Sequence, residues 1–81
     1  MEEKLRQFIG KKVHITFESH RFKTPENPGG IYELNGIVLE VNPQWSYFDE
    51  VQTNYPPGFE YRVGFGFQPL NTTRIRSVEQ A

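Results

Sequence analysis

The sequence predicts a mainly β protein, in which a short N-terminal helix precedes a strongly bent, five-stranded antiparallel sheet that forms a small open barrel. β-branched and aromatic residues fill 28 of the 81 positions, whereas Ala, Leu and Met together fill only 6, which favours strands. Several segments alternate apolar with polar residues, as strands with one buried face do. Helical spacing of apolar residues is confined to the N-terminus.

The N-terminal helix is predicted at residues 2–9. Leu5, Phe8 and Ile9 share one stripe at helical spacing, and Gly10 supplies a stop signal directly after them. Two acidic residues in the first turn suit the positive end of a helix dipole. The helix is therefore expected to be short and to end at the glycine.

The strands are predicted from the alternation and from the turn residues that separate them. Their approximate ranges are 11–17, 31–42, 45–53, 59–67 and 71–78. Segment 18–30 contains two prolines and two glycines, so a long surface loop is expected between the first two strands. The length suits one domain, and we assign the whole of 1–81 to it.

The second strand is expected to change its buried face part-way along. Its apolar residues occupy even positions up to Leu34 but odd positions from Ile37 to Val41, so the parity flips at Asn35-Gly36. A glycine at such a flip is typical of a bulge or a sharp bend. This bend is expected to curl the short sheet toward a barrel.

The composition restricts the classes of function. The formal net charge is −1, so one copy is not expected to bind nucleic acid or an anionic membrane strongly and non-specifically. Without cysteine there is no disulfide and no thiolate site. No apolar run reaches the length of a signal peptide or a membrane span, which favours a cytoplasmic protein with no membrane partner. A small core without covalent reinforcement makes oligomerisation a natural source of stability.

No residue pattern indicates catalysis, and we expect neither an enzyme nor a cofactor. Asp49 and Glu50 are adjacent on a predicted strand and so point to opposite faces, which does not suit a paired acid and base. His14 and His20 have no third ligand at a recognisable spacing. No metal site is therefore predicted.

Two groups of side chains are candidates for binding nucleic acid. Trp45 belongs to an aromatic cluster after the Asn42-Pro43 turn, and it either stacks on a base or fills the core. Arg74 and Arg76 share a parity in the last predicted strand, and so a face. They either present paired guanidinium groups to phosphates, or form a solvated edge or intersubunit pairs with Glu. The sequence alone leaves both pairs of alternatives open.

Two stretches of the chain carry a family resemblance. The first includes Leu5, Phe8, Gly10, Lys11 and Val13. The second is Leu34-Asn35-Gly36-Ile37-Val38-Leu39-Glu40-Val41-Asn42, which looks like the glycine-to-aspartate half of the first Sm motif, with Asn42 at the aspartate position. On these residues the chain resembles a divergent member of the Sm-like superfamily (Sm, LSm and Hfq). The long loop at 18–30 is similar to that of phage-encoded members.

The resemblance implies an Sm-like, SH3-like barrel that assembles into a homo-oligomeric ring of about five to seven subunits. In such a ring, strand four of one subunit pairs with strand five of the next. Single-stranded RNA would bind around the central pore, in keeping with an RNA chaperone role. The candidate RNA-binding residues are Asn42, Gln44, Trp45, Ser46, Gln68, Arg74 and Arg76. Gln68-Pro69 stands where the second Sm motif normally has an Arg-Gly pair.

A function from another class is the alternative. The same barrel could serve as a protein interaction or structural module without a nucleic acid partner. The net charge of −1 and the altered RNA-binding positions motivate this alternative. Salt-sensitive binding of oligo-U or oligo-A RNA would count against it.

Overall fold

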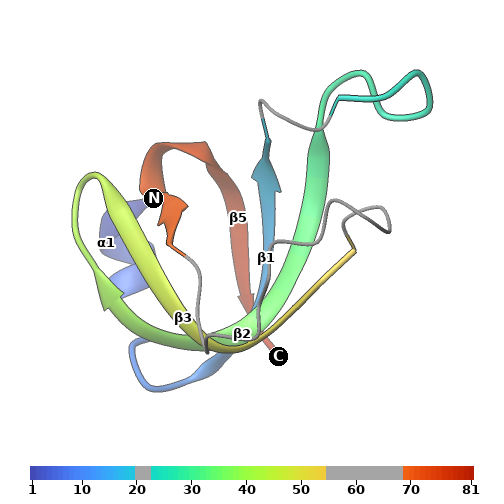
Figure 1. The fold of residues 1–81 in the computed structure, drawn as a ribbon. Helices are drawn as coiled ribbons and strands as arrows, with labels where there is room; N and C mark the ends of the chain where they lie inside the picture. Colours follow the sequence, from blue (N-terminus) through green and yellow to red (C-terminus); the bar gives the residue numbers. More distant parts are fainter. Residues whose placement is uncertain (20–22, 55–68) are drawn as a thin grey trace.

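Five strands form one antiparallel sheet behind a short N-terminal helix (Figure 1). The computed structural model describes residues 1–19, 23–54 and 69–81. In chain order the elements are α1 (Glu2–Arg6), β1 (Lys12–Glu18), β2 (Ile31–Val41), β3 (Trp45–Thr53), β4 (Leu70–Asn71), the 3₁₀ helix η2 (Thr72–Arg74) and β5 (Ile75–Gln80). The strand order is β4-β3-β2-β1-β5, and the sheet is bent but not closed. The predicted fold class, a mainly β open barrel, is confirmed.

The helix is shorter than predicted, since α1 ends at Arg6 instead of residue 9. Ile9 forms a parallel bridge with Val38 of β2, and the Gly10 amide donates to the Val38 carbonyl at 2.7 Å. Gly10 has a φ of +84°, a conformation that glycine adopts without strain. The chain thus leaves the helix because its backbone attaches to β2.

β2 is bent where its register with β3 shifts. The first shift lies between Asn35 and Ile37, where β3 carries an additional residue and Glu50 has a φ of +52°. Gly36 lies at this point, and a Cβ there would come within 3.0 Å of the Asp49 carbonyl oxygen. A side chain at Gly36 would crowd the Asp49 backbone, so glycine suits the close approach of the two strands.

The buried face of β2 continues beyond the predicted flip at Gly36. Leu34, Gly36 and Val38 are all buried. The face changes at Leu39, which is 44% exposed, and Val41 is buried again. The predicted position of the flip was wrong because the additional residue at Gly36 belongs to β3. A second register shift, after Val38, inserts the additional residue in β2 itself.

The candidate site depends on the boundaries of β3 and of the elements near the C-terminus. β3 has the predicted bounds, and the strand predicted at 59–67 lies outside the described residues. The strand predicted at 71–78 is instead divided into β4, η2 and β5. The side-chain oxygen of Asn71 accepts from the Thr73 amide at 3.0 Å and so caps η2. This local cap interrupts the extended backbone.

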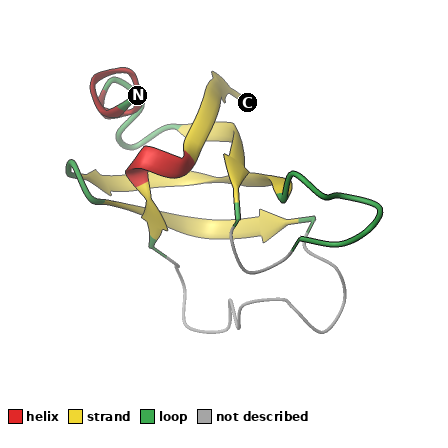
Figure 2. Ribbon diagram, turned by 90° about the horizontal axis from the view of Figure 1, so that it is seen from above, coloured by secondary structure: helices red, strands yellow, loops and turns green. Residues whose placement is uncertain are grey.

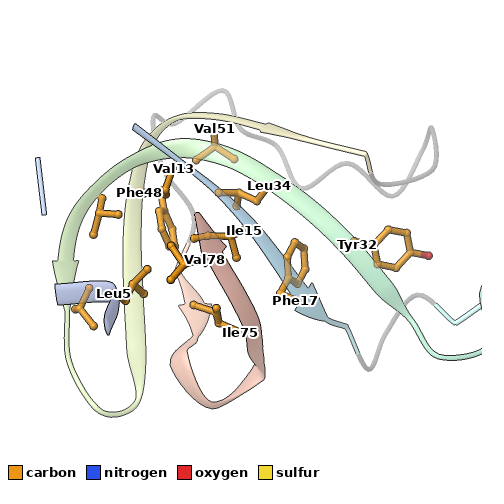
Figure 3. Packing of buried hydrophobic residues seen from close by; sticks show 12 residues of the cluster. Leu5, Val13, Ile15, Phe17, Tyr32, Leu34, Phe48, Val51, Ile75 and Val78 are labelled. Carbon is orange, nitrogen blue, oxygen red and sulfur yellow. The ribbon is translucent and has the colours of Figure 1, made fainter. Parts of the chain in front are cut away.

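The core fills the concave side of the bent sheet (Figure 3). Its members are Leu5, Val13, Ile15, Phe17, Tyr32, Leu34, Val38, Val41, Phe48, Val51, Ile75 and Val78. Leu5 brings α1 into this cluster, and Figure 2 shows the helix at one side of the sheet. Within the described residues, no helix has the length and apolar character needed to cross a bilayer.

Candidate nucleic-acid interface

A tight turn after β2 holds two exposed side chains in place. The side-chain oxygen of Asn42 accepts from the amides of Gln44 and Trp45 at 2.9 and 2.7 Å. The Asn42 amide donates to the Trp45 carbonyl at 2.9 Å, which closes the turn. Asparagine followed by proline favours such a turn, because the amide side chain bonds the backbone just beyond it. Gln44 is consequently exposed, and so is Trp45, at 37%.

The turn packs against the segment that precedes β5. Trp45 pairs with Asn71 across β3 and β4, and the Thr72 amide donates to the Gln44 carbonyl at 3.0 Å. Residues far apart in the sequence therefore form one continuous surface. We call residues 42–45 and 71–74 the Trp45 surface. It contains the exposed Trp45 indole, the exposed Gln44 amide and the capped η2, which ends at Arg74.

Buried hydroxyl groups join the two halves of the Trp45 surface. Thr72 donates its hydroxyl proton to the Asn42 carbonyl at 2.9 Å. Since Thr72 has only one hydroxyl proton, Ser46 must be the donor in their shared hydrogen bond of 2.6 Å. Ser46 is 0% exposed. The structure thus gives this predicted RNA-binding residue a structural position beneath the surface.

Replacing Thr72 with valine tests this connection. The Thr72→Val variant keeps the shape but leaves the Ser46 hydroxyl and the Asn42 carbonyl without their partner, and it should lose about 1–2 kcal/mol of unfolding free energy. Urea denaturation measures the change. Thr73→Val is the control, because its hydroxyl also donates a hydrogen bond, to the Asn71 side-chain oxygen at 2.7 Å, but is exposed; an equal loss in both variants would contradict the role assigned to Thr72.

Arg74 and Arg76 were predicted to share a strand face, and in the structure they do not. Arg74 ends η2, whereas Arg76 lies in β5 at the register shift opposite Thr16 and Phe17. The Arg76 guanidinium donates to the Glu18 carboxylate of β1 and forms an ion pair with it. The predicted face was wrong because it assumed one uninterrupted strand.

The ion pair changes the acidity of Glu18. The hydrogen bond from Arg76, together with the charge of that guanidinium, lowers the pKa of the Glu18 carboxyl below its ordinary value. The charges of Lys23 and Arg74 act in the same direction, while desolvation opposes them. Glu18 is therefore held as a carboxylate among three cations. Gln68, the remaining predicted residue, lies outside the described residues.

A second polar cluster lies on β1 and β2, and the sequence analysis did not single it out. The ring nitrogens of His14 lie 2.9 Å from the Asn35 side-chain oxygen and 3.2 Å from a Glu33 carboxylate oxygen. The hydrogen bond with Asn35 is the main cause that raises the pKa of His14; Glu33 and Glu79 contribute, and burial opposes them. The register pairs His14 with Asn35, so knowledge of the pairing would have revealed this contact.

The raised pKa of His14 gives a pH-dependent contribution to stability. This contribution should be complete below the ordinary pKa of about 6.5 and be lost as the pH rises through the raised value. An NMR titration of the His14 ring should give a midpoint above about 6.5. Asn35→Ala should lower that midpoint, whereas Gln52→Ala, opposite Asn35 on β3, should leave it nearly unchanged. A wild-type midpoint at or below the ordinary value would contradict the assignment.

The described residues contain no group of three or more His, Asp or Glu side chains that could hold a metal ion. Comparisons of the chain with protein-family models, with curated proteins and with solved structures gave no match. The resemblance to the Sm-like superfamily thus rests on the residues quoted from the chain itself. Membership of that family stays a prediction.

Proposed function

We propose that the protein binds single-stranded RNA as an Sm-like, ring-forming protein. The observation that carries this proposal is the contact between the turn at 42–45 and the segment at 71–74. This contact pairs Trp45, whose indole is exposed, with Asn71, three positions before Arg74 in the chain, and the exposed Gln44 directly precedes Trp45. The resemblance implies RNA contacts from these two segments.

The chemistry of the Trp45 surface suits an unpaired nucleotide. An exposed aromatic ring can stack on any base, which contributes about 1–3 kcal/mol for each base. The exposed Gln44 amide can donate to and accept from a base edge. Arginine supplies charge for the phosphates. Single-stranded RNA offers base faces, base edges and phosphates at once, because its bases are not occupied by pairing.

A ring would give such a small site adequate affinity. With a net charge of −1, one chain has little general attraction for RNA. In the described part of the chain, β4 and β5 are the edges of an open sheet. An edge strand that adds a neighbouring subunit head-to-tail produces a closed ring where the rotation closes. Several copies of the Trp45 surface would then bind one RNA together.

The first experiment measures the mass of the purified protein by light scattering coupled to size exclusion. We expect a discrete particle of about five to seven times the 9.5 kDa chain mass. Labelled oligo-U or oligo-A RNA should elute with this particle and dissociate as the salt concentration rises. A monomer that takes up no RNA would overturn the proposal and favour the protein interaction module.

A further inference from the structure

Glu18 occupies an unusual position beside the Trp45 surface. Phe17 pairs with Ile75, so the antiparallel register brings Glu18, the next residue of β1, toward Arg74, and the ion pair joins Glu18 to Arg76 on the other side of Ile75. Lys23, from the loop after β1, is the third cation whose charge acts on this carboxylate. Among the described residues, Arg76 thus contacts the carboxylate at the end of β1, and the charges of Lys23 and Arg74 also act on it.

Arg76 is accessible to a ligand although it is already paired. Its side chain is 60% exposed, whereas that of Glu18 is 22% exposed. A carboxylate and a phosphate bind a guanidinium group through the same N–H donors. An exposed ion pair contributes little net free energy, so a phosphate can exchange with the carboxylate. A phosphate can therefore bind these cations only by competing with the Glu18 carboxylate.

We propose that Glu18 is an internal competitor for phosphate, and that the Glu18–Arg76 ion pair limits how strongly Lys23, Arg74 and Arg76 bind the RNA backbone. For RNA this inference rests on the proposed function. Arg74 ends η2 within the Trp45 surface, and Arg76 follows two positions later in β5, so the cationic side chains continue along the chain from that surface. Glu18 weakens general binding to phosphates and leaves selection to contacts with the bases.

The test compares the Glu18→Gln variant with the wild type and with Glu79→Gln. The glutamine keeps the size of Glu18 but removes its charge. Glu79 is exposed on β5, the strand that also carries Arg76, so Glu79→Gln controls for the change in net charge. Labelled oligo-U RNA is titrated at several salt concentrations, and urea denaturation verifies that each variant is folded. A double variant, Glu18→Gln/Arg76→Gln, also removes the Arg76 guanidinium.

Glu18→Gln should bind the RNA about two- to fivefold more tightly than the wild type for each site engaged. Its affinity should also fall more steeply with salt, by about 0.7 in the logarithmic slope for each additional phosphate contact. Glu79→Gln should gain less, and Arg76→Gln in the Glu18→Gln background should remove the gain. Equal affinities of Glu18→Gln and Glu79→Gln would overturn the inference.

A second probe separates this inference from the proposed function. Inorganic tripolyphosphate carries the phosphate charge but no base, and calorimetric titration measures its binding. If neither the wild type nor Glu18→Gln binds RNA, the proposed function fails. Tighter tripolyphosphate binding by Glu18→Gln than by Glu79→Gln would then still support phosphate competition by Glu18. Equal binding would overturn it.

Discussion

Replacing Phe48 with alanine is expected to reduce the unfolding free energy by about 3–5 kcal/mol. Phe48 is 0% exposed and pairs with Val38 between the two register shifts that bend β2 and β3. Its ring fills the concave side of that bend (Figure 3). Domains of this size retain about 5–15 kcal/mol in total, so the loss would remove much of the stability.

The shift in the urea midpoint of Phe48→Ala measures this effect. Leu39→Ala is the matched control, because Leu39 is a large apolar side chain that the bulge in β2 leaves exposed. We expect this variant to lose less than about 1 kcal/mol. Similar losses in the two variants would mean that the bend does not organise the core as described.

The strands could be predicted where alternation alone decides them. In β1, Val13, Ile15 and Phe17 are buried and the residues between them are partly exposed, so the pattern and the structure agree. In β2 the pattern was ambiguous, because the apolar Ile37 and Leu39 suggested a buried odd face. The register with β3 shows that one bulge in β3 and one in β2 compensate each other. A register depends on both strands together, so the sequence of β2 alone does not reveal it.

The candidate site could be predicted in part for the same reason. The turn begun by Asn42 depends on adjacent residues, and its exposed Trp45 was foreseen as one of two possibilities. Ser46 shares its parity with the buried Phe48, a signal of burial that the neighbouring aromatic residues obscured. Its partner Thr72 lies 26 positions away, so their hydrogen bond could not be read from either segment alone.

The separation of Arg74 from Arg76 had a local signal that was missed. Asn71-Thr72-Thr73 lies within the strand predicted at 71–78, although asparagine before two threonines favours a capped turn. That cap forms η2 and moves Arg74 off the strand. The pairing of Arg76 with Glu18 spans 58 positions and depends on the completed sheet.

The largest effect on binding is expected at the Trp45 surface, and the Trp45→Ala variant tests it. Loss of one stacked base costs about 1–3 kcal/mol, which corresponds to about a 5- to 150-fold weaker affinity for single-stranded RNA. Fluorescence anisotropy with labelled oligo-U measures this change at a fixed salt concentration. Trp45→Phe keeps an aromatic ring and should recover most of the affinity.

Comparison with other variants shows whether stacking is the cause. Leu39→Ala also removes an exposed apolar side chain but lies outside residues 42–45 and 71–74, so its RNA affinity should equal that of the wild type. Arg74→Ala should weaken binding and also reduce its salt dependence, because it removes a charge, whereas Trp45→Ala should leave the salt slope unchanged. If both Trp45→Ala and Arg74→Ala bind RNA as the wild type does, the Trp45 surface is not the binding site. A loss in Trp45→Ala that Trp45→Phe restores would assign the contact to the aromatic face, since the two variants differ only in the ring.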